Sequence, residues 1–210
     1  NTVNDVVGSI ALIPLLVPIN IYRKIHYFHH GFNRKDPHTS ALDTFVITGK
    51  FKKLKTVYYY FVWYISVFFG VLFLPSQLSS KISPAFKGWQ MKDQFVAILL
   101  FCIGLLFHYV TFQLLGKQYY LLVLGFPMLS FAWVLSLLVY IFHYDTTIGE
   151  EVRYNVRSVR PVPVISWILM NFNEHATHHQ HPNIPWYELP SKRKQLPDVY
   201  AIKNQQTTNF

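Results

Sequence analysis

The chain has 210 residues, of which 51% are hydrophobic, 18% are aromatic and only 14% are charged. Its length fits one domain, but its apolar residues lie in long blocks, which excludes an ordinary soluble domain and indicates a membrane protein. The formal net charge of +9 would suggest nucleic acid in a soluble protein, but the basic residues cluster at the ends of the apolar blocks, as membrane topology signals do, so we expect no nucleic-acid partner. The one cysteine, Cys102, excludes an intrachain disulfide.

The first apolar block, residues 6–21, is interrupted by Gly8, Pro14 and Pro18. It is too short and too broken for a confident crossing, so we expect an interfacial or half-buried helix. It leads directly into the stretch RKIHYFHH, where His26, His29 and His30 are spaced i, i+3 and i+4. On a helix these positions share one face, so the three imidazoles can converge on one point.

Three further apolar blocks follow, at residues 57–74, 95–115 and 119–142. The first is marginal for a span and is predicted to be interfacial or partly inserted. The other two are separated only by residues 116–118, so we expect a transmembrane hairpin over 95–142, with a kink at Pro127. His108 lies inside this hairpin and is predicted to be hydrogen-bonded within the helical bundle.

From residue 143 the chain becomes polar, and 143–190 is predicted to form a cap that carries a second cluster in NEHATHHQHPNIPWYELP. His175, His178 and His179 repeat the earlier spacing, and residues 191–210 form a polar tail. Neutral imidazole is a common ligand for iron, copper, zinc and nickel. The fold class is therefore all-α, with a transmembrane helical hairpin and interfacial helices that carry a histidine-rich cap.

The topology follows from parity. Both clusters must lie on one side of the membrane if they share a site, which requires an even number of crossings between them. If 57–74 does not cross, every Lys and Arg except Lys117 lies on one face. That bias places the histidine clusters on the cytoplasmic side.

The pattern HYFHH, then a long membrane section, then NEHATHHQHPNIPWYELP, resembles the integral-membrane fatty acid desaturases. The likeness extends over most of the chain, so residues 1–210 are interpreted as a single, partial desaturase-like domain. The first histidine box of that family is not in the sequence and is expected just before Asn1. We therefore expect these residues alone to be inactive.

The resemblance implies a site with two iron ions and no catalytic residue apart from the metal ligands. It implies the ligands His26, His29, His30, His143, His175, His178 and His179. Asn171 and Asn173 are candidates for holding a water or orienting a ligand, although capping or turn formation explains them equally well. Asp145 and Glu174 are candidates for accepting the second N–H of an imidazole, with solvated surface charge as the alternative.

The implied function is a fatty acyl desaturase, which uses O2 and two electrons to place a double bond in an acyl chain. The implied partners are an acyl or lipid substrate, the membrane and a separate electron donor of the ferredoxin or cytochrome b5 type. Two alternatives stay open: a membrane di-iron hydroxylase or ketolase acting on a lipid, carotenoid or alkane, and a non-catalytic metal-binding membrane protein. The ending PNIPWYELP favours the desaturase.

Overall fold

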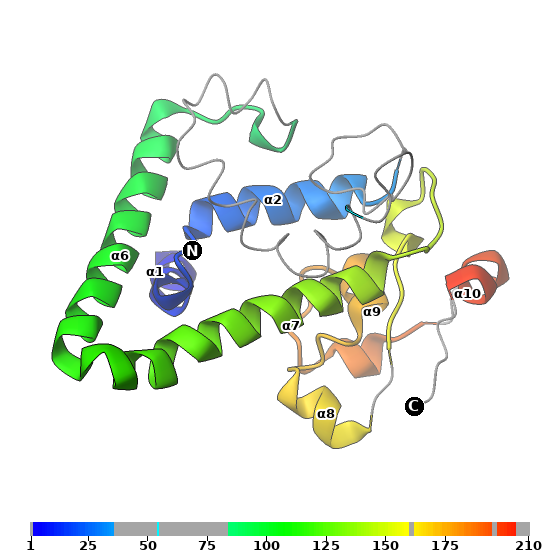
Figure 1. The fold of residues 1–210 in the computed structure, drawn as a ribbon. Helices are drawn as coiled ribbons and strands as arrows, with labels where there is room; N and C mark the ends of the chain where they lie inside the picture. Colours follow the sequence, from blue (N-terminus) through cyan, green and yellow to red (C-terminus); the bar gives the residue numbers. More distant parts are fainter. Residues whose placement is uncertain (1, 36–53, 55–83, 160–161, 195–196, 205–210) are drawn as a thin grey trace. The chain divides into compact units, whose positions relative to one another are not determined.

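The computed structural model describes residues 2–35, 54, 84–159, 162–194 and 197–204 (Figure 1). Every regular element in these ranges is helical, as the apolar blocks predict. The longer elements in chain order are α1 (Thr2–Leu12), α2 (Ile19–Phe32), α6 (Met91–Tyr120), α7 (Phe126–His143), α8 (Pro163–Ile168), α9 (His175–Gln180) and α10 (Asp198–Asn204). The predicted interfacial segment 57–74 lies outside the described residues.

The chain divides into two compact units. The first comprises Asn1–Tyr27 and Lys53–Leu137, and the second comprises Phe28–Lys52 and Leu138–Phe210. Two helices, α2 and α7, begin in the first unit and end in the second. The second unit therefore contains the ends of both helices, where His29, His30 and His143 lie.

The broken first block forms two helices instead of one. The axes of Thr2–Leu15 and Ile19–Phe32 differ by 98°. The break contains Leu16, whose φ of 56° lies in the left-handed region, and it is flanked by Pro14 and Pro18. Because proline lacks an N–H and restricts the residue before it, a continuous helix is unfavourable here.

Within the first unit, α6 packs closely on the short 3-10 helix η1 (Ile13–Leu15). A Cβ added to Gly104 would lie 2.7 Å from the Leu16 Cδ2 atom and 3.0 Å from the Ile13 carbonyl oxygen, so a side chain here would force Leu16 and the adjoining backbone to shift. His108 lies one turn further along α6 and forms hydrogen bonds with the Tyr120 hydroxyl at 2.8 Å and the Pro14 carbonyl at 2.9 Å. The prediction that His108 is hydrogen-bonded within the helical bundle is confirmed.

The long apolar stretch Met91–His143 is interrupted where the sequence predicts a turn. Gly116 has a φ of 71° and breaks α6, and Figure 1 shows the chain turning between α6 and α7. The π-helical turn η3 (Leu121–Gly125) follows and ends just before Pro127. Proline has no N–H to donate to the carbonyl four residues before it. The irregular turn contains that carbonyl, which Pro127 leaves without its usual partner.

The stretch Met91–His143 is long and apolar enough to cross a membrane. Only 11% of its most apolar window is buried by protein, whereas the central helix of a soluble domain is mostly buried. Large side chains such as Phe95, Leu106 and Leu114 are exposed along α6. Exposed apolar surface of this extent is typical of a helix that faces a bilayer. The placement of both arms in a bilayer stays a prediction.

The second unit has a small apolar core at the end of α7. Phe142, Val156 and Ala176 are buried together, and Phe172 packs against them. Phe142 also stacks on the ring of His175, with centroids 4.7 Å apart. This core therefore brings the end of α7, the segment after it and α9 to one place, although these segments are distant in sequence.

Candidate metal centre

Three histidines lie on the last turns of α2. His26 and His30 are one turn apart on the same helix, and His29 lies beside them. Tyr22 stacks on His26, with ring centroids 5.4 Å apart. On the helix surface the apolar residues Ile21, Ile25 and Phe28 are buried, so α2 has a packed apolar side as well as its histidines.

The second cluster occupies α9, a helix of six residues. His175 and His179 are buried, one turn apart, and His178 is half-buried. Such a short helix depends on contacts outside itself. The Ala176 N–H donates to the Ser158 hydroxyl oxygen at 3.0 Å, and the Asn173 side-chain amide donates to the Val159 carbonyl at 3.1 Å.

The second unit brings four imidazoles from three distant segments into one buried group: His29, His143, His175 and His179. One nitrogen from each of them lies within 4.8 Å of one nitrogen from each of the others. The Nε2 atoms of His29 and His179 are 3.0 Å apart, and those of His143 and His175 are also 3.0 Å apart. Beside this four-histidine group, the Nε2 atoms of His30 and His178 form a third pair at 3.0 Å.

The spacing of these nitrogens matches the spacing of ligands around a metal ion. Two ligands at a right angle, on an ion with bonds of about 2.1 Å, lie about 3.0 Å apart. The donor set consists of imidazoles alone, with no thiolate, which suits a first-row transition metal such as iron. In the described part of the chain, the buried Nδ1 atoms of His175 and His179 form no hydrogen bond, so protein contacts alone leave these rings incompletely satisfied.

The protonation of the cluster also suits ligation. Burial holds the pKa of His175 and of His179 well below the usual value, and the neighbouring imidazoles lower it further. Burial, with a smaller contribution from His29, lowers the pKa of His178 to about 4. These rings are therefore neutral at pH 7, and a neutral imidazole has the lone pair that a metal requires.

A buried polar network ties the end of α2 to the segment after α7. The Arg34 guanidinium donates to the carbonyl oxygens of Thr146 and Thr147 at 2.9 and 3.1 Å. Thr146 in turn donates its hydroxyl to the His143 carbonyl at 2.9 Å. Burial lowers the pKa of Arg34 to about 10, opposed by the charge of Asp145, so the guanidinium stays charged at pH 7. The network links the end of α2, which carries His29, to the segment that follows His143.

Two asparagines complete this network, and nothing in the sequence marked them. Asn155 donates to the carbonyls of Asn33, Arg34 and Gly149 and accepts a hydrogen bond from the Thr147 hydroxyl. Asn204, at the end of α10, accepts from the Thr147 N–H at 2.8 Å. Each asparagine lies in a polar stretch that reads as loop or tail, and the sequence has no signal for their burial.

The four residues predicted to support the metal ligands have other partners. Glu174 is buried, and its carboxylate forms an ion pair with Arg193 and accepts a hydrogen bond from Thr177. In the described ranges, the Glu174 carboxylate accepts no hydrogen bond from an imidazole. Asn171 has a φ of 52° and donates to the Trp186 carbonyl, which is the turn role left open above. The Asn173 side-chain amide donates to the Val159 carbonyl, and the Val159 N–H donates to the Asn173 carbonyl. Asp145 is exposed, and its charge acts on Arg34.

The fold and the site define an all-helical protein with a helix apolar enough to span a membrane and a buried multi-histidine centre. The chain belongs to the fatty acid desaturase family, whose family model matches residues 1–206. No curated protein and no solved structure gave a match. The resemblance seen in the two histidine motifs is therefore confirmed at the level of the family, which is membrane-integral and has oxidoreductase activity at a di-iron centre.

Proposed function

We propose that this protein is a fatty acyl desaturase. The observation that carries the proposal is the group of four buried histidines in a chain that matches the desaturase family over nearly its whole length. The reaction removes two hydrogens from adjacent carbons of an acyl chain. O2 takes up these two hydrogens together with two electrons and two protons, and two water molecules are released.

We propose a role for each group of histidines. His29, His143, His175 and His179 would hold one iron ion, and His30 and His178 would contribute to a second, with His26 one turn from His30 on α2. When iron is bound, it supplies O2 activation for the removal of hydrogen from an unactivated carbon. The chain itself supplies neutral nitrogen ligands and a buried position from which water is excluded.

The proposal extends to the protein's surroundings. We place the histidine centre on the cytoplasmic side of the membrane, because the basic residues favour that face. The electrons would come from a separate ferredoxin or cytochrome b5 type donor, and the substrate would be an acyl lipid. These assignments rest on charge distribution and on family membership.

The test is expression of the full-length protein in a host of known lipid composition, followed by analysis of its fatty acids. We expect a new double bond with the natural sequence and none with His179→Ala. The Gln180→Ala variant is the matched control, because Gln180 lies on the same helix and, among the described residues, its side chain bonds only the Ala176 carbonyl of that helix. An oxygenated product would favour the hydroxylase or ketolase, and unchanged lipids with both sequences would favour the non-catalytic protein.

A further inference from the structure

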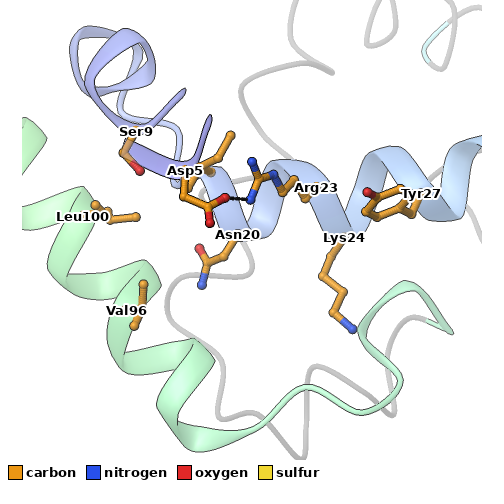
Figure 2. Close-up of a pocket in the computed structure, with 9 residues that line it drawn as sticks. Asp5, Ser9, Asn20, Arg23, Lys24, Tyr27, Val96 and Leu100 are labelled. Carbon is orange, nitrogen blue, oxygen red and sulfur yellow. Dashed lines mark hydrogen bonds and ion pairs between the residues drawn. The ribbon is translucent and has the colours of Figure 1, made fainter. Parts of the chain in front are cut away.

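The first unit contains a pocket of about 450 Å³ that the desaturase proposal does not use. Figure 2 shows its lining side chains, which come from α1, α2 and α6. The α6 side contributes Val96 and Leu100, and α2 contributes Ile19, so one part of the pocket is apolar. The α2 side also contains Arg23 and Lys24. The pocket is therefore amphipathic, with a charged end and an apolar end.

The cations of the pocket are held in place by protein contacts. Arg23 forms an ion pair with Asp5, drawn as a dashed line in Figure 2. The Lys24 ammonium donates to the Lys87 carbonyl at 3.4 Å, in the turn that precedes α6. Asn20 donates from its side chain to the Asp93 carbonyl at 2.8 Å, which joins α2 to the first turn of α6. The lining is therefore organised before any ligand arrives.

The charges of the lining identify the class of ligand. Arg23 and Lys24 contribute two positive charges and Asp5 one negative charge, so the pocket has a net charge of one positive. A phosphodiester has one negative charge and accepts hydrogen bonds from guanidinium and ammonium groups. The hydroxyls of Ser9 and Tyr27 also line the pocket and can donate to phosphate or glycerol oxygens.

The apolar end fits the rest of a phospholipid. Val96 lies on α6 and is 42% exposed, and the neighbouring Phe95 and Leu99 are exposed as well. These residues belong to the stretch that is apolar enough to cross a membrane, and they lie near its start, which basic residues precede. An acyl chain can follow this exposed side of α6 while its headgroup stays at the membrane surface.

We propose that this pocket binds an anionic glycerophospholipid, with the phosphodiester at the Lys24 ammonium and one acyl chain on Val96 and Leu100. The site is separate from the four-histidine group in its residues, and it does not depend on iron or on turnover. It commits to a headgroup phosphate joined to an acyl chain. A free phosphate would satisfy only the cations of the lining, and a fatty acid would leave the Ser9 and Tyr27 hydroxyls without phosphate or glycerol oxygens to bind.

The experiment measures lipid binding to the purified full-length protein in detergent by native mass spectrometry. The probes are phosphatidylglycerol, the uncharged dioleoylglycerol, oleate and inorganic phosphate. We expect retention of phosphatidylglycerol alone. Lys24→Gln should weaken that binding about fivefold, which is the usual contribution of one interfacial lysine. Val96→Trp should also weaken it, because the indole would fill the path of the acyl chain without changing the charge.

Lys117→Gln is the matched control, since Lys117 is an exposed lysine at the other end of α6 and lies outside the pocket. Its affinity for phosphatidylglycerol should equal that of the natural protein. Equal binding by the Lys24 and Lys117 variants would overturn the proposal, as would equal retention of dioleoylglycerol or oleate. Retention of inorganic phosphate alone would show an anion site with no role for the acyl chain and would also overturn it. None of these outcomes depends on desaturase activity.

Discussion

The histidines of α9 are neutral in the folded protein, and this has a consequence for stability. In the metal-free protein the pKa of His175 and of His179 lies well below 6.5, and that of His178 is about 4. Below pH 6.5 the unfolded chain takes up protons that the folded chain does not. Linkage then lowers the free energy of unfolding as the pH falls, by about 1.4 kcal/mol per pH unit for each such histidine.

We therefore expect the chelator-treated protein to melt at a lower temperature at pH 5.5 than at pH 7.5. Thermal unfolding in detergent, followed by circular dichroism, measures the difference. The His178→Gln variant lacks one of these groups and should lose less stability over the same range. A melting temperature that does not change with pH would contradict the neutral, buried state of these rings.

The ion pair of Glu174 and Arg193 stabilises the start of α9. The Glu174 side chain is 3% exposed and that of Arg193 is 37% exposed. The buried carboxylate therefore needs the guanidinium as its counter-charge, whereas the guanidinium can also be solvated by water. Replacing Arg193 with alanine leaves a buried charge without its partner. We expect a loss of about 1–3 kcal/mol in the free energy of unfolding, reduced from the usual value for fully buried pairs because Arg193 reaches solvent.

Chemical denaturation of the Arg193→Ala and Arg153→Ala variants measures this loss. Arg153 pairs with Glu151 with both side chains more than half exposed, so its removal should change stability by less than about 1 kcal/mol. Equal losses in the two variants would show that burial of Glu174 does not set the strength of its pair.

At the scale of helices, close packing of η1 on α6 depends on one glycine. Any side chain at Gly104 meets Leu16 and the Ile13 carbonyl, so Gly104→Val should cost about 1–3 kcal/mol through overpacking. Gly31 is the matched control. It lies inside α2, and an added Cβ would meet nothing within 4 Å. Gly31→Ala should raise stability by about 0.4–1 kcal/mol. Melting temperatures that fall equally in both variants would contradict the packing argument.

The helices themselves were predictable from the sequence, because apolar blocks and glycine or proline breaks act locally. The turn at Gly116 and the interruption around Pro14 and Pro18 lie where the sequence places them. The 98° angle between the first two helices was not predictable. It depends on how Leu16 and the residues around it pack against α6, and such contacts between distant segments leave no periodic pattern.

The clustering of the histidines was predictable from the sequence, but the way they pair was not, and their role as ligands stays a prediction. The i, i+3, i+4 spacing identified two triads, and the structure divides these triads between neighbouring groups. His29 joins His143, His175 and His179, whereas His30 pairs with His178. The sequence places adjacent residues together, but His29 and His30 point in directions about 100° apart on a helix, so each meets a different partner.

At the scale of the whole molecule, polar contacts connect many of the described segments of the second unit. Its apolar core is small, while Asn155 alone binds three carbonyls and one hydroxyl from segments before and after α7. Buried polar groups of this kind are costly when they lose their partners. We therefore expect the geometry of the four-histidine group to depend on Asn155, whose side-chain hydrogen bonds in the described residues go to other partners than its rings.

We expect Asn155→Asp to disrupt these polar contacts even though the side chain keeps its shape. A carboxylate cannot donate to the carbonyls of Asn33, Arg34 and Gly149, and it would face three acceptors at close range. The variant should lose several kcal/mol of stability and most of its bound iron, measured by melting temperature and by metal analysis of the purified protein. Membrane insertion should be unchanged, because Met91–His143 is not altered.

Asn171→Gly is the control, since Asn171 has a positive φ that glycine adopts freely, and this variant should keep its iron. Full iron content in the Asn155→Asp protein would show that the polar network does not position the histidines.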